Sequence, residues 1–185
     1  MRTVSALSIA LLALVLVLTG CDEDEETIVL DDPNTPTTSS FTFEYNRSDV
    51  DNGVVIVTSE ENDTITNILQ EFGFARGDVV DARVSAARMA RITAPSVRPK
   101  VFDYLGSVEV SHGSSPSDPL VALRSPIDDT AEQDLDVVDD ADITSVVQNG
   151  ATPLTMELQV DDASQVPESG DEVRITLTYR LEVQE

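Results

Sequence analysis

Several residue types that build catalytic and metal centres are scarce in this chain of 185 residues. The sequence contains no tryptophan, a single histidine, His112, and a single cysteine, Cys21. One cysteine cannot form a disulfide within the chain, and one histidine with one cysteine falls short of the ligand sets that hold zinc. No glycine loop of the kind that cradles phosphate is present. We therefore expect no bound cofactor.

Basic residues are few as well. The chain has 11 Lys and Arg against 35 Asp and Glu, which gives a formal net charge of −24. Such a field repels nucleic acid and anionic lipid headgroups, so neither is an expected partner. The acids are spread along the whole chain. We interpret the excess as a halophilic adaptation, because salt near 1 M shortens the Debye length to about 3 Å and screens self-repulsion.

The N-terminal segment combines a positive charge with a short apolar run. Arg2 is the only charged residue before Cys21, and residues 6–18 are almost wholly Ala, Leu, Ile and Val. These features are typical of a secretory signal peptide. The run ends in Leu18-Thr19-Gly20-Cys21, which resembles the bacterial lipobox of an apolar residue, a small residue, glycine and a lipid-accepting cysteine.

The resemblance to bacterial lipoproteins implies cleavage between Gly20 and Cys21. Cys21 would then carry a diacylglycerol group and a further acyl chain such as palmitate, and two or more chains anchor a protein stably. The implied location is the cell envelope, in the outer membrane, on its surface or its periplasmic face. Two alternatives stay open: an uncleaved transmembrane helix over residues 3–20, and a secretory signal with an incidental cysteine.

The chain divides into three parts by composition. Residues 1–20 are the predicted signal peptide, residues 21–40 a lipidated cysteine with an acidic disordered tether, and residues 41–185 one domain. The acidic block at 22–26 resists compaction and resembles a signal for surface export, while residues 31–40 are polar and interrupted by proline. A chain of this length is sufficient for one ordinary core.

Alternating apolar and polar residues predict a domain built from strands. The pattern is clearest at residues 173–183, and it slips near Ala87 and Met89, as at a β-bulge. About seven strands are predicted, at residues 41–45, 54–57, 78–93, 101–112, 120–123, 154–160 and 173–183. Because strands and helices do not alternate along the chain, the predicted fold class is all-β, a single β-sandwich of immunoglobulin-like or jelly-roll-like type.

Two short helices accompany the predicted strands. Asp63 or Thr64 can cap the first, which carries an apolar face and ends at Gly73. Asp142 can cap the second, which ends at Gly150. Helices this short would close one end of a sheet structure.

His112 is the only candidate for acid–base catalysis. It precedes Ser114 and Ser115, and Asp103 or Asp118 could complete a Ser/His/Asp hydrolase. However, the sequence has no nucleophile-elbow pattern, and closeness in sequence is not triad geometry. His112 also continues the apolar face of its strand. We therefore expect a protein that is not an enzyme, with a hydrolase as an alternative.

Two acidic stretches are weak candidates for calcium. The first contains Asp49 and Asp51, and the second, within the polar region 125–142, contains Asp134, Asp136 and Asp139. Neither matches the twelve-residue calcium loop with its spaced acids and final glutamate. Hydrated acidic loops explain both stretches equally well, so a calcium-stabilised ligand-binding module is an alternative function.

The tripeptide Arg76-Gly77-Asp78 matches the motif that integrin ligands display. It lies between the predicted first helix and the next strand, where Gly-Asp is ordinary turn chemistry. Taken together, the sequence predicts a lipid-anchored envelope protein with a structural, adhesion or binding role. The membrane is its first partner, through the lipid, and a protein or a glycan is the second.

The charge excess leads to a prediction about salt. We expect the melting temperature to be higher in 1 M NaCl than in dilute buffer, because added ions screen repulsion among the carboxylates. Circular dichroism melts across a NaCl series measure this directly. A melting temperature that stays level or falls as NaCl rises would contradict the halophilic interpretation.

Overall fold

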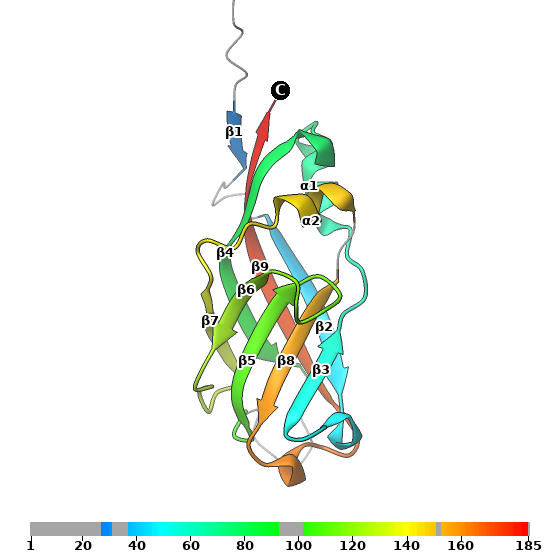
Figure 1. Ribbon diagram of the computed structural model, residues 1–185, viewed down its shortest axis with the longest axis vertical. Helices are drawn as coiled ribbons and strands as arrows, with labels where there is room; N and C mark the ends of the chain where they lie inside the picture. Colours follow the sequence, from blue (N-terminus) through cyan, green and yellow to red (C-terminus); the bar gives the residue numbers. More distant parts are fainter. Residues whose placement is uncertain (1–26, 31–36, 93–101, 151–152, 185) are drawn as a thin grey trace, which may run out of the picture.

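A computed structural model describes residues 27–30, 37–92, 102–150 and 153–184 (Figure 1). The predicted signal peptide and the lipidation site at Gly20 and Cys21 lie outside these residues. Within them, the chain forms nine strands and two short α-helices. The predicted all-β sandwich is confirmed, with two strands more than expected.

Two antiparallel sheets share one strand and face each other across the core. The first sheet contains β1 (Thr27–Leu30), β2 (Thr38–Tyr45), β9 (Asp171–Gln184), β4 (Val79–Arg91) and β7 (Glu132–Val137). The second contains β7, β6 (Leu120–Arg124), β5 (Leu105–His112), β8 (Leu154–Val160) and β3 (Val54–Thr58). Since β7 pairs with both β4 and β6, the hydrogen-bonded path turns a corner there and leaves β2 and β3 as neighbours on the opposite side.

The C-terminal strand β9 lies inside the first sheet and pairs with other strands along both of its edges. One edge of β9 pairs with β2 over Asp171–Thr178 and with β1 over Leu181–Gln184, and the other edge pairs with β4. Its alternation is confirmed, because six of its apolar side chains are fully buried: Val173, Ile175, Leu177, Tyr179, Leu181 and Val183. Arg174 and the other residues between them face outward.

The predicted tether over residues 21–40 is wrong in part, because β1 and the start of β2 lie within it. Leu30 pairs with Leu181 and is buried, so residues 27–30 belong to the domain. These residues read Thr-Ile-Val-Leu, which is a β-favouring run. The acidic block before this run and the two prolines after it dominate the local composition, so composition alone does not reveal the strand.

The strand β7 was also missed, within the acidic region 125–142. Glu132, Asp134 and Asp136 are the outward residues of a strand whose inward residues include Gln133 and Leu135. A buried glutamine interrupts the apolar phase that would have revealed the strand. The Gln133 side-chain oxygen has a hydrogen-bond partner inside the protein, because it accepts from the Asp128 amide at 3.0 Å.

The long strand β4 contains the predicted irregularity, slightly earlier than expected. Its register against β9 shifts between Val84 and Ala86, and again between Val79 and Asp81. Ser85 and Ala86 are both exposed, which is the signature of a bulge. The predicted slip near Ala87 and Met89 is therefore confirmed to within a few residues, because both of these side chains follow the new inward phase.

Both predicted helices are present, as α1 (Thr64–Glu71) and α2 (Thr144–Asn149). Gly73 ends the first with φ at +87°, and the Asp142 side chain caps the second by accepting from the Thr144 amide at 2.8 Å. The cap of α1 comes from Asn62, whose side-chain oxygen accepts from the Thr64 amide at 2.7 Å. Asp63 makes no such bond. In the described part of the chain, no helix has both the length and the apolar character needed to cross a bilayer.

Candidate functional site

A polar groove of about 580 Å³ lies where β2 and β3 border each other without pairing. It is bounded by β2 on one side and by the end of β3 with the following loop on the other. Its lining consists of hydroxyl, carboxylate and amide side chains beside one aromatic residue: Ser40, Phe41, Thr42, Glu44, Thr58, Ser59, Glu60, Glu61 and Asn62. The volume falls within the range of ligand-binding clefts, but the lining is far more polar than usual.

The backbone of β2 also faces this groove. Thr37 accepts a hydrogen bond from the Tyr179 amide, so the odd-numbered residues of this strand direct their backbone groups toward β9. The carbonyl of Ser40 points the other way and accepts from the Asn62 side chain at 3.1 Å. Thr42 and Glu44 share the phase of Ser40. The groove therefore offers a strand edge as well as side-chain hydrogen-bonding groups.

These groups can recognise a polar ligand. Hydroxyls and carboxylates can hydrogen-bond the hydroxyls of a glycan or the amides of an extended peptide. The lining residues include no histidine, cysteine or basic side chain. Sequence reasoning missed the groove because the strand order, which no local pattern encodes, brings its two sides together.

A buried polar cluster lies at the start of β9. The guanidinium of Arg91 forms a two-pronged ion pair with Asp171, with Nε to Oδ1 at 2.8 Å and Nη2 to Oδ2 at 2.7 Å. The Tyr104 hydroxyl donates to Asp171, and Tyr45 and Tyr104 share a hydrogen bond of 2.6 Å. The side chains of Arg91 and Asp171 are only 2% and 0% exposed.

Because its side chains are enclosed in the core, we interpret this cluster as structural. Burial raises the pKa of Tyr45 and of Tyr104, so both hydroxyls stay protonated and remain able to donate. A buried ion pair is weak evidence for net stability, but removing one partner typically costs about 3–5 kcal/mol because the other charge stays buried. The signal was present in the sequence, since Arg91 follows the inward phase of Ala87 and Met89.

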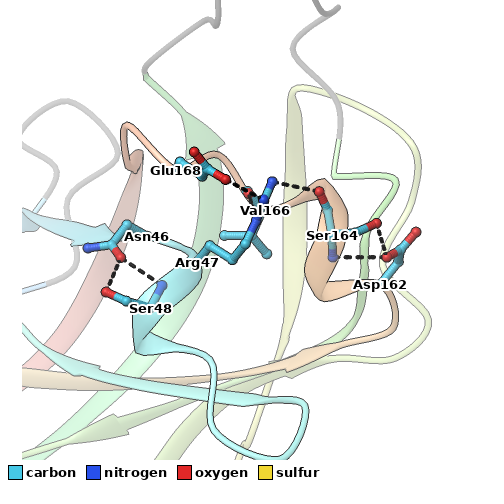
Figure 2. A network of polar contacts seen from close by, with 7 residues as sticks. All are labelled: Asn46, Arg47, Ser48, Asp162, Ser164, Val166 and Glu168. Atoms are coloured by element: carbon cyan, nitrogen blue, oxygen red, sulfur yellow. Dashed lines mark hydrogen bonds and ion pairs between the residues drawn. The ribbon is translucent and has the colours of Figure 1, made fainter.

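A second polar network ties together two loops at one end of the sandwich (Figure 2). The Arg47 guanidinium donates to the carbonyls of Ser164 and Val166 at 2.7 and 3.0 Å, and pairs with Glu168 at 2.7 Å. Because the carbonyl bonds involve a charged donor, they are stronger than neutral ones. Arg47 therefore fastens the β2–β3 connection to the β8–β9 connection.

Both loops of this network are shaped by the same local device. The Asn46 side-chain oxygen accepts from the Ser48 amide at 2.8 Å and from its hydroxyl at 2.6 Å. Asp162 holds Ser164 in the same manner, at 3.0 and 2.6 Å. Such Asx turns satisfy backbone amides locally. Asn46, which matches a glycosylation acceptor pattern, thus already has a structural role.

His112 lies at the end of β5 inside the core and is 0% exposed. Its Nε2 is 3.2 Å from the Tyr179 hydroxyl, and the two rings meet edge to face. Asp103 precedes β5, so more than about 20 Å of extended strand separates it from His112. Asp118 instead accepts from the Ser115 amide at 2.8 Å and closes a turn. The structure does not bring the candidate triad together.

The calcium candidates fall into two separate places. Asp49 accepts from the Asn46 amide at 2.7 Å, and the Asp51 side chain accepts from Asn52 at 3.0 Å. Asp134 and Asp136 stand on the outer face of β7, near arginines: Arg88 lies 2.9 Å from Asp134, and Arg124 lies 3.9 Å from Asp136. Asp139 follows in the loop after β7. Across the ranges that the structure describes, no three His, Cys, Asp or Glu side chains converge on a metal-sized site.

The Arg76-Gly77-Asp78 tripeptide forms a 3₁₀ turn directly before β4. The Arg76 side chain donates to Thr66 at 2.7 Å and to the carbonyls of Val147 and Gly150. It is only 15% exposed. This arginine therefore joins α1 to α2 and is not displayed as an adhesion ligand would be.

No family model matches this chain, and a search of curated proteins finds no match either. The inference about function therefore rests on the residues themselves. Of the candidates above, the groove beside β2 has the accessibility that a ligand or partner needs, whereas His112 and the Arg91–Asp171 pair are enclosed in the core.

The environment of His112 predicts acid sensitivity. Burial lowers its pKa from 6.5 to about 4. Between these values the unfolded chain binds a proton that the folded chain does not, so stability falls as the pH drops from 6.5 to 4, by up to roughly 3 kcal/mol. Above pH 6.5 His112 contributes no pH dependence.

Urea unfolding at pH 7 and pH 4, in the same salt, measures this effect for the parent and for His112→Gln. The variant keeps a polar group beside Tyr179 but cannot titrate, and the carboxylates titrate equally in both proteins. We expect the parent to lose roughly 2–3 kcal/mol more than the variant. Equal losses in the two proteins would show that His112 is not buried as a neutral group.

Proposed function

We propose that this chain is a lipid-anchored, non-enzymatic protein of the bacterial cell envelope, held in the outer membrane, whose β-sandwich binds a protein or glycan partner. The observation that carries the proposal is the sequence Leu18-Thr19-Gly20-Cys21 at the end of an apolar run. Its cysteine has no competing disulfide role, because the chain contains no second cysteine.

The position of β1 supports an anchor at this point. The domain begins at Thr27, so only residues 22–26 separate it from Cys21. A membrane-bound Cys21 would hold the sandwich close to the bilayer.

The groove beside β2 supports a binding role. It combines a strand edge with Ser, Thr, Glu and Asn side chains, the groups that pair with glycan hydroxyls or with a peptide backbone. The only histidine is committed to the core beside Tyr179.

Replacement of Cys21 by serine tests the anchor. Since a serine hydroxyl replaces the thiol that accepts the diacylglycerol, we expect Cys21→Ser to leave the membrane fraction and to appear in the soluble fraction. Thr19→Ser is the matched control, because it keeps a small residue in the lipobox and should remain in the membrane. Both proteins would be expressed in a bacterium and followed by fractionation in high salt and carbonate.

Equally firm membrane association of Cys21→Ser and the parent would refute the lipid anchor. In that case an uncleaved apolar segment over residues 3–20 would be the membrane attachment.

A further inference from the structure

Four large apolar side chains are strongly exposed among the described residues: Val29, Ile56, Phe72 and Val80, at 40–54%. Scattered exposed side chains of this kind are ordinary on protein surfaces. Three of these, however, belong to elements that lie at one end of the molecule: β1, the end of α1 and the start of β4 (Figure 1). We call Val29, Phe72 and Val80 the end patch.

The sheet register places two members of the end patch across β9 from each other. Glu182 pairs with Val29 of β1 on one side and with Asp81 of β4 on the other. Two strand spacings therefore separate the flanking strands, which is about 10 Å. Val80 lies in the register shift between Val79 and Asp81, which leaves it exposed beside the buried Val79.

Phe72 is exposed for a different reason. It is the residue at which α1 stops, immediately before the left-handed Gly73. Ile65 and Leu69 fill the space below the helix instead. An exposed phenylalanine at a helix end, with 40% of its surface accessible, gives the end patch its largest apolar group.

The same end of the molecule receives the chain from the proposed anchor. Between Cys21 and Thr27 the chain can extend at most about 20 Å. A lipidated Cys21 would therefore keep the end patch beside the bilayer. Tethering of this kind gives a high effective concentration, so a small apolar contact suffices to hold an orientation.

We propose that the end patch rests in the headgroup region of the same bilayer that holds the acyl chains of Cys21, a proposal that depends on the lipid anchor proposed above. The headgroups it fits are zwitterionic. Asp81 and Glu182 beside the end patch are paired with Arg83 and Arg180, but the net charge of −24 on the chain would repel an anionic surface.

The lack of tryptophan in this chain provides a clean test. A single indole would be introduced by Phe72→Trp or Val80→Trp, with Ile56→Trp as the matched control, because Ile56 is more exposed than either residue but lies on β3. Each lipidated protein would be incorporated into phosphatidylcholine vesicles, with or without brominated acyl chains. Flotation of the vesicles would confirm attachment before fluorescence is recorded.

We expect the indoles at positions 72 and 80 to emit at shorter wavelength in vesicles and to be quenched by the brominated lipid. The indole at position 56 should show neither change. Proteins that float with the vesicles but show no quenching at positions 72 and 80 would overturn the proposed contact and leave the anchor intact. Proteins that do not float at all would overturn the anchor, and the contact with it.

Discussion

Arg91 and Asp171 form an ion pair inside the sandwich, at the point where strands of the first sheet meet the turn that leads into the second. Arg91 ends β4, Asp171 begins β9, and the pair is extended by Tyr45 from β2 and Tyr104 from the turn before β5. Three strands of the first sheet and the entrance to the second therefore meet in one hydrogen-bonded cluster. These buried charged and polar groups depend on one another, because the loss of any one of them would leave its partner buried without a hydrogen bond or an opposite charge.

The cluster holds the first residue of β9, where the pairing of this strand with its neighbours begins. From Asp171 onward, β9 aligns β2 and then β1 along one edge and β4 along the other. Near Asp171, the Arg47 network closes the loops, while at the opposite end β1 receives the N-terminal chain (Figures 1 and 2). The two ends of the sandwich therefore differ. The Arg47 network lies at one end, the end patch lies at the other next to the proposed anchor, and the groove lies beside β2.

Much of this architecture could be predicted from local patterns. The alternation of apolar and polar residues identifies β9, and the glycines that follow the two helices mark their ends. The strand β7 could not be predicted, since its inward Gln133 breaks the apolar phase that identifies a strand. The groove could not be predicted either, because Thr42 and Thr58 come together only through the order of the strands. Arg91 was predictable in principle from its inward phase, but a charged residue in the core is rare enough to be overlooked.

We propose that lipid on Cys21 holds this sandwich at the membrane. Mass spectrometry of the mature protein, purified from a bacterial envelope and digested, measures this modification. We expect an N-terminal peptide that begins at Cys21 and carries the mass of a diacylglycerol group, with or without a further acyl chain. A peptide that begins upstream of Cys21, or one that begins there with an unmodified thiol, would contradict it.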